Sequence, residues 1–187
     1  MIIGKEVIRY KEIDSTNEEA RRLIRKGAGE GLVLVADLQT KGKGKPGSRW
    51  FSPKGNLYLS AIVRPYKNPK DLAPITLLGA LASRSMLTKI SGLPVAIKWP
   101  NDLRIHGRKV GGILTERLPS GSQQLLGYLV IGIGININVG RRSFPEDLRG
   151  RSTSLKIESR KSFSLDRCLR ILLRELDREY LAYLSKV

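Results

Sequence analysis

Residues 39–53 read QTKGKGKPGSRWFSP, and the apolar runs on either side, LVLVA at 32–36 and LYLSAIV at 57–63, predict a strand before and after this loop. Within the loop, Gly42, Gly44 and Gly47 have the G-x-G-x-x-G spacing of dinucleotide-binding loops. That motif requires a helix to begin at its third glycine, whereas here another strand follows. No Gly-Lys-Ser/Thr closes the loop either, so it is not a Walker loop.

The composition of the loop nevertheless suits an anion. Its glycines allow backbone N–H groups to approach a phosphate closely, and Lys41, Lys43, Lys45 and Arg49 add positive charge. The alternative is a flexible surface loop that happens to be basic. Trp50, beside these cations, could cover an adenine ring or pack in the core.

The segments around the loop predict an α+β fold. Further strands are expected at 6–10, 95–99, 103–105, 110–118 and 125–133, with a hairpin turn at His106-Gly107 and another at residues 119–122. Helices are expected after a capping box formed by Ser15 and Glu18, from Pro69 to about Ile90, and over residues 164–184. Consecutive hairpins with helices clustered elsewhere predict a mixed, mainly antiparallel sheet backed by helices.

Length and composition indicate one cytoplasmic domain spanning residues 1–187. The first residues carry charges where a signal peptide needs an apolar core, no apolar run is long enough for a membrane span, and the single Cys168 cannot form an internal disulfide. The 34 Lys and Arg residues against 17 Asp and Glu residues give a net charge of +17. This charge leaves three interpretations open: nucleic acid binding, an acidic protein or phosphorylated substrate, and solubility alone.

Five motifs in a fixed order carry a family resemblance. They are STN at 15–17, ADLQTKGKGK at 36–45 continued by SPKGNLYLS at 52–60, KWPND at 98–102, KVGGILTE at 109–116 and GIGININ at 132–138. Together they resemble the catalytic domain of biotin-protein ligases. The resemblance implies a fold related to class II aminoacyl-tRNA synthetases and lipoate ligases. It also implies that biotin and MgATP form biotinyl-5′-adenylate, which a lysine of a biotin carboxyl carrier protein then attacks.

The resemblance also assigns the site residues. The residues implied for biotin binding are Ser15, Thr16, Asn17, Gln39, Lys43, Gly44, Lys45, Lys98, Gly111 and Gly112. Those implied for ATP or the adenylate are Lys45, Trp50, Asn101 and Asn136, with Asp102 as a further nucleotide or acceptor-lysine group. Short hydroxyls and an amide suit the ureido ring of biotin, and Lys43, Lys45 and Lys98 are the expected catalytic cations. Magnesium is expected to arrive with ATP, because no metal site is visible in the sequence.

Two features depart from the family pattern. Lysines stand at 43 and 45 where the family usually has arginines, which keeps the charge but loses the bidentate guanidinium geometry. We also expect neither an N-terminal helix-turn-helix domain nor a C-terminal β-barrel domain, because the resemblance to the catalytic domain spans nearly the whole chain. The resemblance leaves a homodimer open as the assembly.

Two rival functions remain at this stage. One is a lipoate or octanoate ligase on the same fold, against which stands the lack of the R-R-x-x-G-G-G block of lipoate ligases. The other is a basic nucleic-acid-binding protein on a degenerate ligase fold, which the net charge favours although no nucleic-acid-binding motif accompanies it. Neither His106, in a predicted turn, nor Cys168, on an apolar helix face, is a catalytic candidate.

Overall fold

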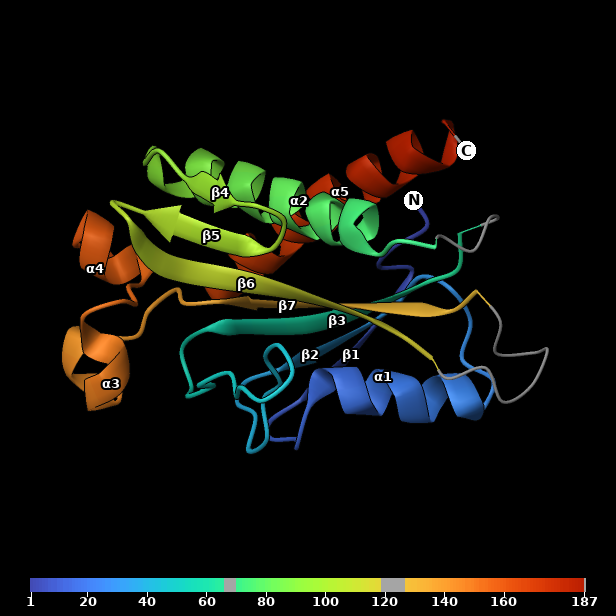
Figure 1. Ribbon diagram of the computed structural model, residues 1–187, viewed down its shortest axis with the longest axis horizontal. Coiled ribbons are helices and arrows are strands. Elements are labelled where there is room, and N and C mark those ends of the chain that lie inside the picture. Colours follow the sequence, from blue (N-terminus) through green and yellow to red (C-terminus); the bar gives the residue numbers. More distant parts are fainter. Residues whose placement is uncertain (66–69, 119–126, 187) are drawn as a thin grey trace.

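The fold is built on one seven-stranded mixed sheet, seen nearly edge-on in Figure 1. The computed structural model describes residues 1–65, 70–118 and 127–186. The strand order is β1-β2-β3-β7-β6-β5-β4, with β1 and β2 parallel and the other neighbours antiparallel. The strands are β1 (Glu6–Tyr10), β2 (Leu32–Ala36), β3 (Leu57–Val63), β4 (Ala96–Lys98), β5 (Asp102–Ile105), β6 (Arg108–Arg117) and β7 (Leu129–Ile135). This sheet confirms the predicted fold class.

Helices cover both faces of the sheet. The long helices α2 (Ala73–Ser91) and α5 (Leu165–Leu184) pack together on one face, and α1 (Thr16–Arg25) lies on the other (Figure 1). A short 3₁₀ turn η2 (Arg141–Ser143) and the helices α3 (Glu146–Arg149) and α4 (Leu155–Ser159) lie at one end of the sheet. None of the helices in the described ranges combines the length and apolar character needed to cross a bilayer.

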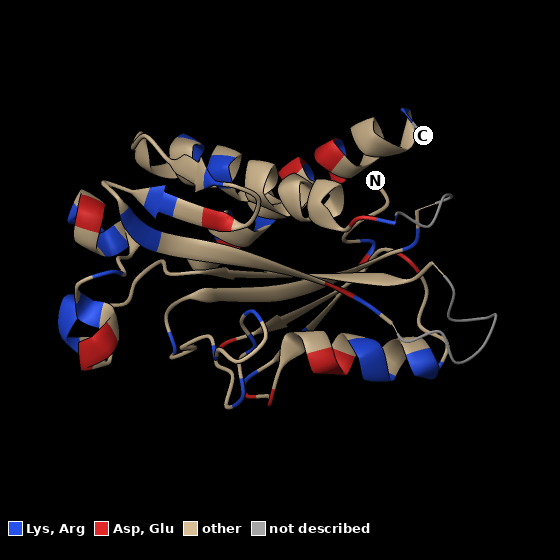
Figure 2. Ribbon diagram, viewed as in Figure 1, with Lys and Arg blue, Asp and Glu red and all other residues tan. Residues whose placement is uncertain are grey.

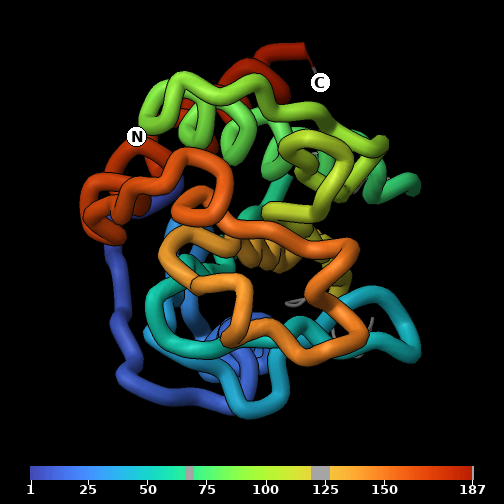
Figure 3. Tube along the Cα trace, turned by 90° about the vertical axis from the view of Figure 1, so that its left-hand side faces the viewer, coloured from blue at the N-terminus to red at the C-terminus, as the bar shows by residue number. Residues whose placement is uncertain are grey.

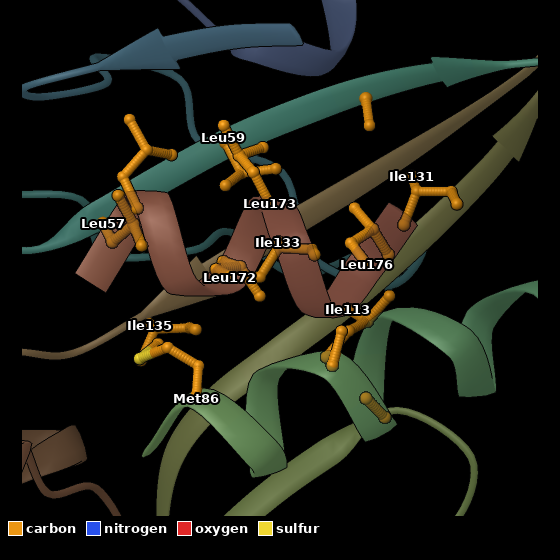
Figure 4. Close-up of a cluster of buried hydrophobic side chains, with 14 of the residues drawn as sticks. Leu57, Leu59, Met86, Ile113, Ile131, Ile133, Ile135, Leu172, Leu173 and Leu176 are labelled. Atoms are coloured by element: carbon orange, nitrogen blue, oxygen red, sulfur yellow. The ribbon is translucent and has the colours of Figure 1, made fainter. Parts of the chain in front are cut away.

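Strand β7 gives the two faces different properties because its sequence, LVIGIGI, alternates large and small residues. Ile131, Ile133 and Ile135 belong to the large core under α2 and α5. Figure 4 shows these isoleucines facing Leu172, Leu176 and Met86. Burying each such side chain stabilises the fold by roughly 1.5–3 kcal/mol. On the α1 face Gly132 and Gly134 follow Val130, and they leave room above the sheet.

Most of the helices and strands expected from the sequence are confirmed, and three of them differ from the expectation at their first residues. Helix α2 begins at Ala73 with Pro74 in its first turn, while Pro69 lies outside the described residues. Strand β7 begins at Leu129, and the expected turn at 119–122 is also outside the described ranges. The expected capping box is wrong: Ser15 stands at the N-cap of α1 without a side-chain cap, its N–H donates to Asp14 Oδ1 at 2.7 Å, and Glu18 accepts a hydrogen bond from Lys43 instead.

Candidate functional site

A cavity of about 400 Å³ lies on the α1 face of the sheet, a volume typical of small-molecule sites. Its walls come from the start of α1, the loop 39–51, strands β5 to β7, and the segment from Phe144 to Ser152. In the end view of Figure 3 the last segment is orange and the loop is cyan. Their contact is direct, since the rings of Phe51 and Phe144 have centroids 6.1 Å apart. The cavity therefore gathers segments from most of the length of the chain.

A hydrogen-bonded network of short polar side chains forms one end of the cavity. The Gln39 amide oxygen accepts bonds from the backbone N–H (2.9 Å) and hydroxyl (3.1 Å) of Thr16, and its nitrogen donates to Ser52 (3.0 Å). Beneath them the fully buried Ser60 hydroxyl bonds to Thr16 Oγ1 (2.8 Å) and Asn17 Oδ1 (2.6 Å). Thr16 and Gln39 are therefore fixed in orientation before any ligand arrives.

Asn17 rests directly on a glycine of the sheet. A Cβ added at Gly132 would lie 2.2 Å from Asn17 Oδ1, so no other residue fits there without moving the asparagine. The Asn17 amide nitrogen donates to Glu116 Oε2 (2.7 Å) and the Leu114 carbonyl (3.4 Å) on β6. Gly132 thus allows α1 to approach the sheet closely enough for Asn17 to reach both strands.

Trp50 lies against a second pair of glycines. Gly112 on β6 and Gly134 on β7 face each other in register, and a Cβ at either would approach the indole, to 3.2 Å and 2.6 Å respectively. The indole Nε1 is buried and has no hydrogen-bond partner among the described residues. Lys109 Nζ stands 5.2 Å from the ring centroid, within the range of a cation–π contact. The tryptophan is therefore held at the floor of the cavity with an unused donor.

The loop folds back on itself as a small hairpin, with Lys43 bridged to Arg49. Gly42 and Gly44 are required by this packing, because a Cβ at either would lie 2.4 Å from Ser52 Oγ or 2.6 Å from Ser48 Oγ. The Gly44 N–H is donated to the Ser48 carbonyl at 3.2 Å. These glycines serve close packing within the loop.

Lys43 is tied to two carboxylates rather than left free. Its ammonium donates to Glu18 and lies 3.5 Å from Glu116 Oε1. The hydrogen bond from Lys43 is the largest influence on Glu18, and it holds the pKa of that carboxyl below its ordinary value although burial opposes this. Lys43 therefore fixes the loop to α1 and β6.

Other cations also line the cavity, and ion pairs of Arg104, Lys109 and Arg151 offset their charge only in part. Lys45, Arg49, Arg104, Lys109 and Arg151 line it, and Asp102 is the only carboxylate among the described lining residues. Lys109 Nζ pairs with Asp102 Oδ1 at 2.7 Å. Lys45 and Arg49 form no ion pair within the part of the chain that the structure describes. This part of the cavity is suited to an anionic ligand.

The two expected asparagines line the cavity but are also engaged in the fold. Asn101 donates to the Ile113 carbonyl at 3.3 Å and is almost fully buried. Asn136 donates to the Thr153 carbonyl at 3.0 Å. The Asn101 amide therefore holds the start of β5 to the middle of β6, and the Asn136 amide holds the end of β7 to the segment before α4.

Twelve expected site residues are brought together in the cavity, and two are not. The twelve are Ser15, Thr16, Asn17, Gln39, Lys43, Gly44, Lys45, Trp50, Asn101, Asp102, Gly112 and Asn136. Lys98 is exposed on the edge strand β4, outside the cavity lining. Gly111 points to the opposite face of the sheet, where a Cβ would meet Leu103 Cδ1 at 2.9 Å, because neighbouring strand residues alternate in direction.

Lys109 lines the cavity, whereas the expected Lys98 does not. The sequence signal was present, since Lys109 begins the KVGGILTE motif that contributes Gly112 to the cavity floor. Arg151 and Ser60 were also missed. Arg151 follows no motif, whereas Ser60 could have been found as the one polar residue within the apolar run of β3.

Comparisons with known proteins identify the family of the chain. The family model described as "Biotin/lipoate A/B protein ligase family" matches residues 10–136. The chain belongs to this family. It is 34% identical to the bifunctional ligase/repressor BirA of Bacillus spizizenii over 98% of this chain, and 37% identical to the biotin–[acetyl-CoA-carboxylase] ligase of Paracoccus denitrificans over 66%. The chain spans only 56% and 51% of these two relatives.

Solved structures show the same fold. The biotin protein ligase of Aquifex aeolicus in complex with biotin and ATP superposes with a TM-score of 0.85 and 34% identity. The match covers 97% of this chain and 73% of that one. The Leishmania major ligase in complex with biotinyl-5-AMP gives a TM-score of 0.75 with 29% identity, covering 92% of this chain and 73% of that one. The class II synthetase-like architecture implied by the motifs is thereby confirmed.

Proposed function

We propose that the protein is a biotin-protein ligase that uses MgATP to attach biotin to a lysine of a biotin carboxyl carrier protein. The observation that carries this proposal is the order of chemical groups along β7. The hydroxyl and amide network lies over Gly132, the indole of Trp50 lies over Gly134, and cations lie beyond it. Such a cavity suits a ligand with a polar head, an apolar body and an anionic tail.

The polar head is the ureido ring of biotin, whose N–H groups and carbonyl match the hydroxyl and amide groups of Thr16, Asn17 and Gln39. Leu114, on the same face of β6 as Gly112, adds apolar surface to the cavity wall and suits the ring and alkyl chain. A lipoyl ring has no polar group that could bond with this network, whereas the ureido ring of biotin has both donors and an acceptor. The cavity therefore favours biotin over lipoate.

The cations serve the first chemical step. The biotin carboxylate oxygen attacks the α-phosphorus of ATP, a carboxyl–phosphate anhydride forms, and pyrophosphate leaves with the bonding electrons. Lys109, which takes the role expected for Lys98, neutralises the carboxylate and the α-phosphate, while Lys45 and Arg49 stabilise the charge on the departing phosphates. Trp50 and Arg151 flank the adenosine. MgATP is the substrate, and the magnesium neutralises its phosphates.

The second step needs an acceptor at the cavity mouth. The neutral amine nitrogen of the carrier lysine attacks the acyl carbon and an amide bond forms. The bond from that carbon to the phosphate oxygen breaks, AMP leaves with the bonding electrons, and the nitrogen loses a proton to water. Arg141 and Arg142 on η2 and Lys45 and Arg49 on the loop are exposed and form no ion pair with any described residue. Figure 2 shows basic residues at the ends of β5 and β6 on this side of the molecule, and both basic and acidic residues on α3. This basic rim suits an acidic carrier surface.

Pyrophosphate exchange with biotin or with lipoate tests the first step. We expect exchange of labelled pyrophosphate into ATP that depends on biotin and not on lipoate. Exchange stimulated only by lipoate would contradict the assignment in favour of a lipoate ligase. Salt-dependent DNA or RNA binding in the absence of any biotin-dependent exchange would instead favour the nucleic-acid-binding alternative.

A further inference from the structure

A buried carboxylate outside the cavity joins three segments of the chain. Glu158 on α4 has a side chain that is only 4% exposed. One oxygen accepts bonds from Arg108 Nη2 at 2.8 Å and from the Thr153 hydroxyl, and the other lies 2.8 Å from His106 Nδ1. His106 and Arg108 belong to the β5–β6 turn and the start of β6, whereas Thr153 lies on the segment before α4. Glu158 therefore fastens this segment to the hairpin.

The fastened segment pairs with the backbone of one cavity residue. The Lys109 N–H donates to the Arg151 carbonyl at 2.9 Å, and the Thr153 N–H donates to the Lys109 carbonyl at 2.8 Å. Lys109 is thus held on one side by β5, where it is in register with Arg104, and on the other by residues 151–153. Its side chain then reaches Asp102 and the indole of Trp50.

Glu158 is ionised in this setting. Burial opposes ionisation, but the hydrogen bonds from Thr153 and His106 and the charge of Arg108 outweigh it, so the pKa of Glu158 lies below its ordinary value. Each oxygen of the charged carboxylate therefore has a partner. Removing the charge weakens the contacts with Arg108, Thr153 and His106 at once.

We propose that Glu158 is a positioning residue for Lys109. Through Arg108 and Thr153 it holds residues 151–153 against β6. This pairing fixes the Lys109 ammonium over the cavity floor, and it also fixes Arg151, which lines the cavity wall. The inference rests on the proposed function for the role of Lys109 in catalysis, and on the contacts alone for the placement of Lys109.

A double-mutant cycle tests this coupling in the full chain. We expect Glu158→Gln to lower kcat/KM of biotin-dependent pyrophosphate exchange about tenfold, and to lower it less than about twofold in the Lys109→Ala background, because coupled residues are not additive. Thr153→Val removes one hydrogen-bond donor to Glu158 and keeps the shape of the side chain. It should give the same pattern with smaller losses, and it replaces Glu158→Gln in the cycle if that variant does not fold.

Glu175→Gln is the matched control. Glu175 is also a buried, ion-paired carboxylate, 9% exposed and held by Lys89, Arg178 and Ser85, but it joins α2 to α5 away from the cavity. It should lower the unfolding temperature while leaving exchange within about twofold in both backgrounds. The proposal would be overturned if Glu158→Gln lowered kcat/KM by the same factor in the wild-type and Lys109→Ala backgrounds, or if it did not lower kcat/KM at all.

A second measurement does not depend on activity. The chain has two tryptophans, so in a Trp99→Phe background all tryptophan emission comes from Trp50. This emission reports the position of the Lys109 ammonium, which lies 5.2 Å from the centroid of the Trp50 ring. We expect Glu158→Gln to change this emission and Glu175→Gln to leave it unchanged; unchanged emission in both would overturn the positioning role. Absence of biotin-dependent exchange in the wild type would contradict the proposed function without affecting this readout.

Discussion

The indole of Trp50 lies so close to Gly134 that a Cβ on this glycine would be 2.6 Å from the indole Nε1. Gly134 also faces Gly112 across β6 and β7, and the ring contacts both. A tryptophan placed on bare backbone needs glycine at both positions, because any side chain there would displace the ring.

Gly134→Ala should therefore push Trp50 off the floor of the cavity. We expect the KM for ATP in pyrophosphate exchange to rise on the order of tenfold, about 1.4 kcal/mol of lost binding. Gly29→Ala is the control, because nothing lies within 4 Å of a Cβ there. An unchanged KM in Gly134→Ala would show that the position of Trp50 does not matter for nucleotide binding.

Lys109 and Lys98 provide a contrasting pair of variants. Lys109→Ala removes a cation from the cavity lining, and we expect it to lower the rate of biotin-dependent exchange by roughly 10²–10³-fold, the usual loss for an electrostatic group at the reacting centre. Lys98→Ala removes an exposed cation at the sheet edge and should retain the wild-type rate. If Lys98→Ala lowered the rate and Lys109→Ala did not, Lys98 would be the catalytic lysine, as the sequence motif alone indicated.

The pH dependence of stability should contain a contribution from Glu158. Because the folded-state pKa of this carboxyl lies below its ordinary value of 4.5, its stabilisation is present above pH 4.5 and is lost as the pH falls through the lower folded-state value. The unfolding temperatures of the wild type and Glu158→Gln should thus differ most at neutral pH and converge in acid. A constant difference from neutral to acidic pH would contradict this linkage.

Ionic strength should affect the two half-reactions differently. If the basic rim at Lys45, Arg49, Arg141 and Arg142 attracts an acidic carrier, added salt screens that encounter, since the Debye length is only about 8 Å at physiological salt. We expect raised salt to slow transfer to the carrier more than adenylate formation, each measured in a single turnover. Equal salt effects on both steps would refute carrier attraction by the rim.

Much of the fold could be predicted from the sequence because its signals are local. The alternation in β7 and the apolar run of β2 determine which residues face the core, and the strand after the glycine loop excluded a Rossmann arrangement. Motif spacing also brought most of the cavity residues together. Local patterns could not reveal which of two lysines reaches the cavity, because that depends on β4 lying at the edge of the sheet and β6 lying inside it.

The contacts of Glu158 were invisible for a related reason. His106, Arg108 and Thr153 reach Glu158 only after α4 packs beside the β5–β6 hairpin, up to 52 residues away along the chain. The sequence likewise predicted a capping box between Ser15 and Glu18, whereas in the structure Glu18 accepts a hydrogen bond from the distant Lys43. Tertiary contacts of this kind override local side-chain preferences.

The most direct test of the proposed function is to incubate the protein with biotin, MgATP and a biotin carboxyl carrier domain, and to measure the mass of the carrier. We predict that the carrier gains the mass of one biotinyl group at its acceptor lysine, and that omission of ATP or replacement of that lysine abolishes the gain. An unmodified carrier under conditions in which an established biotin-protein ligase modifies it would contradict the proposal.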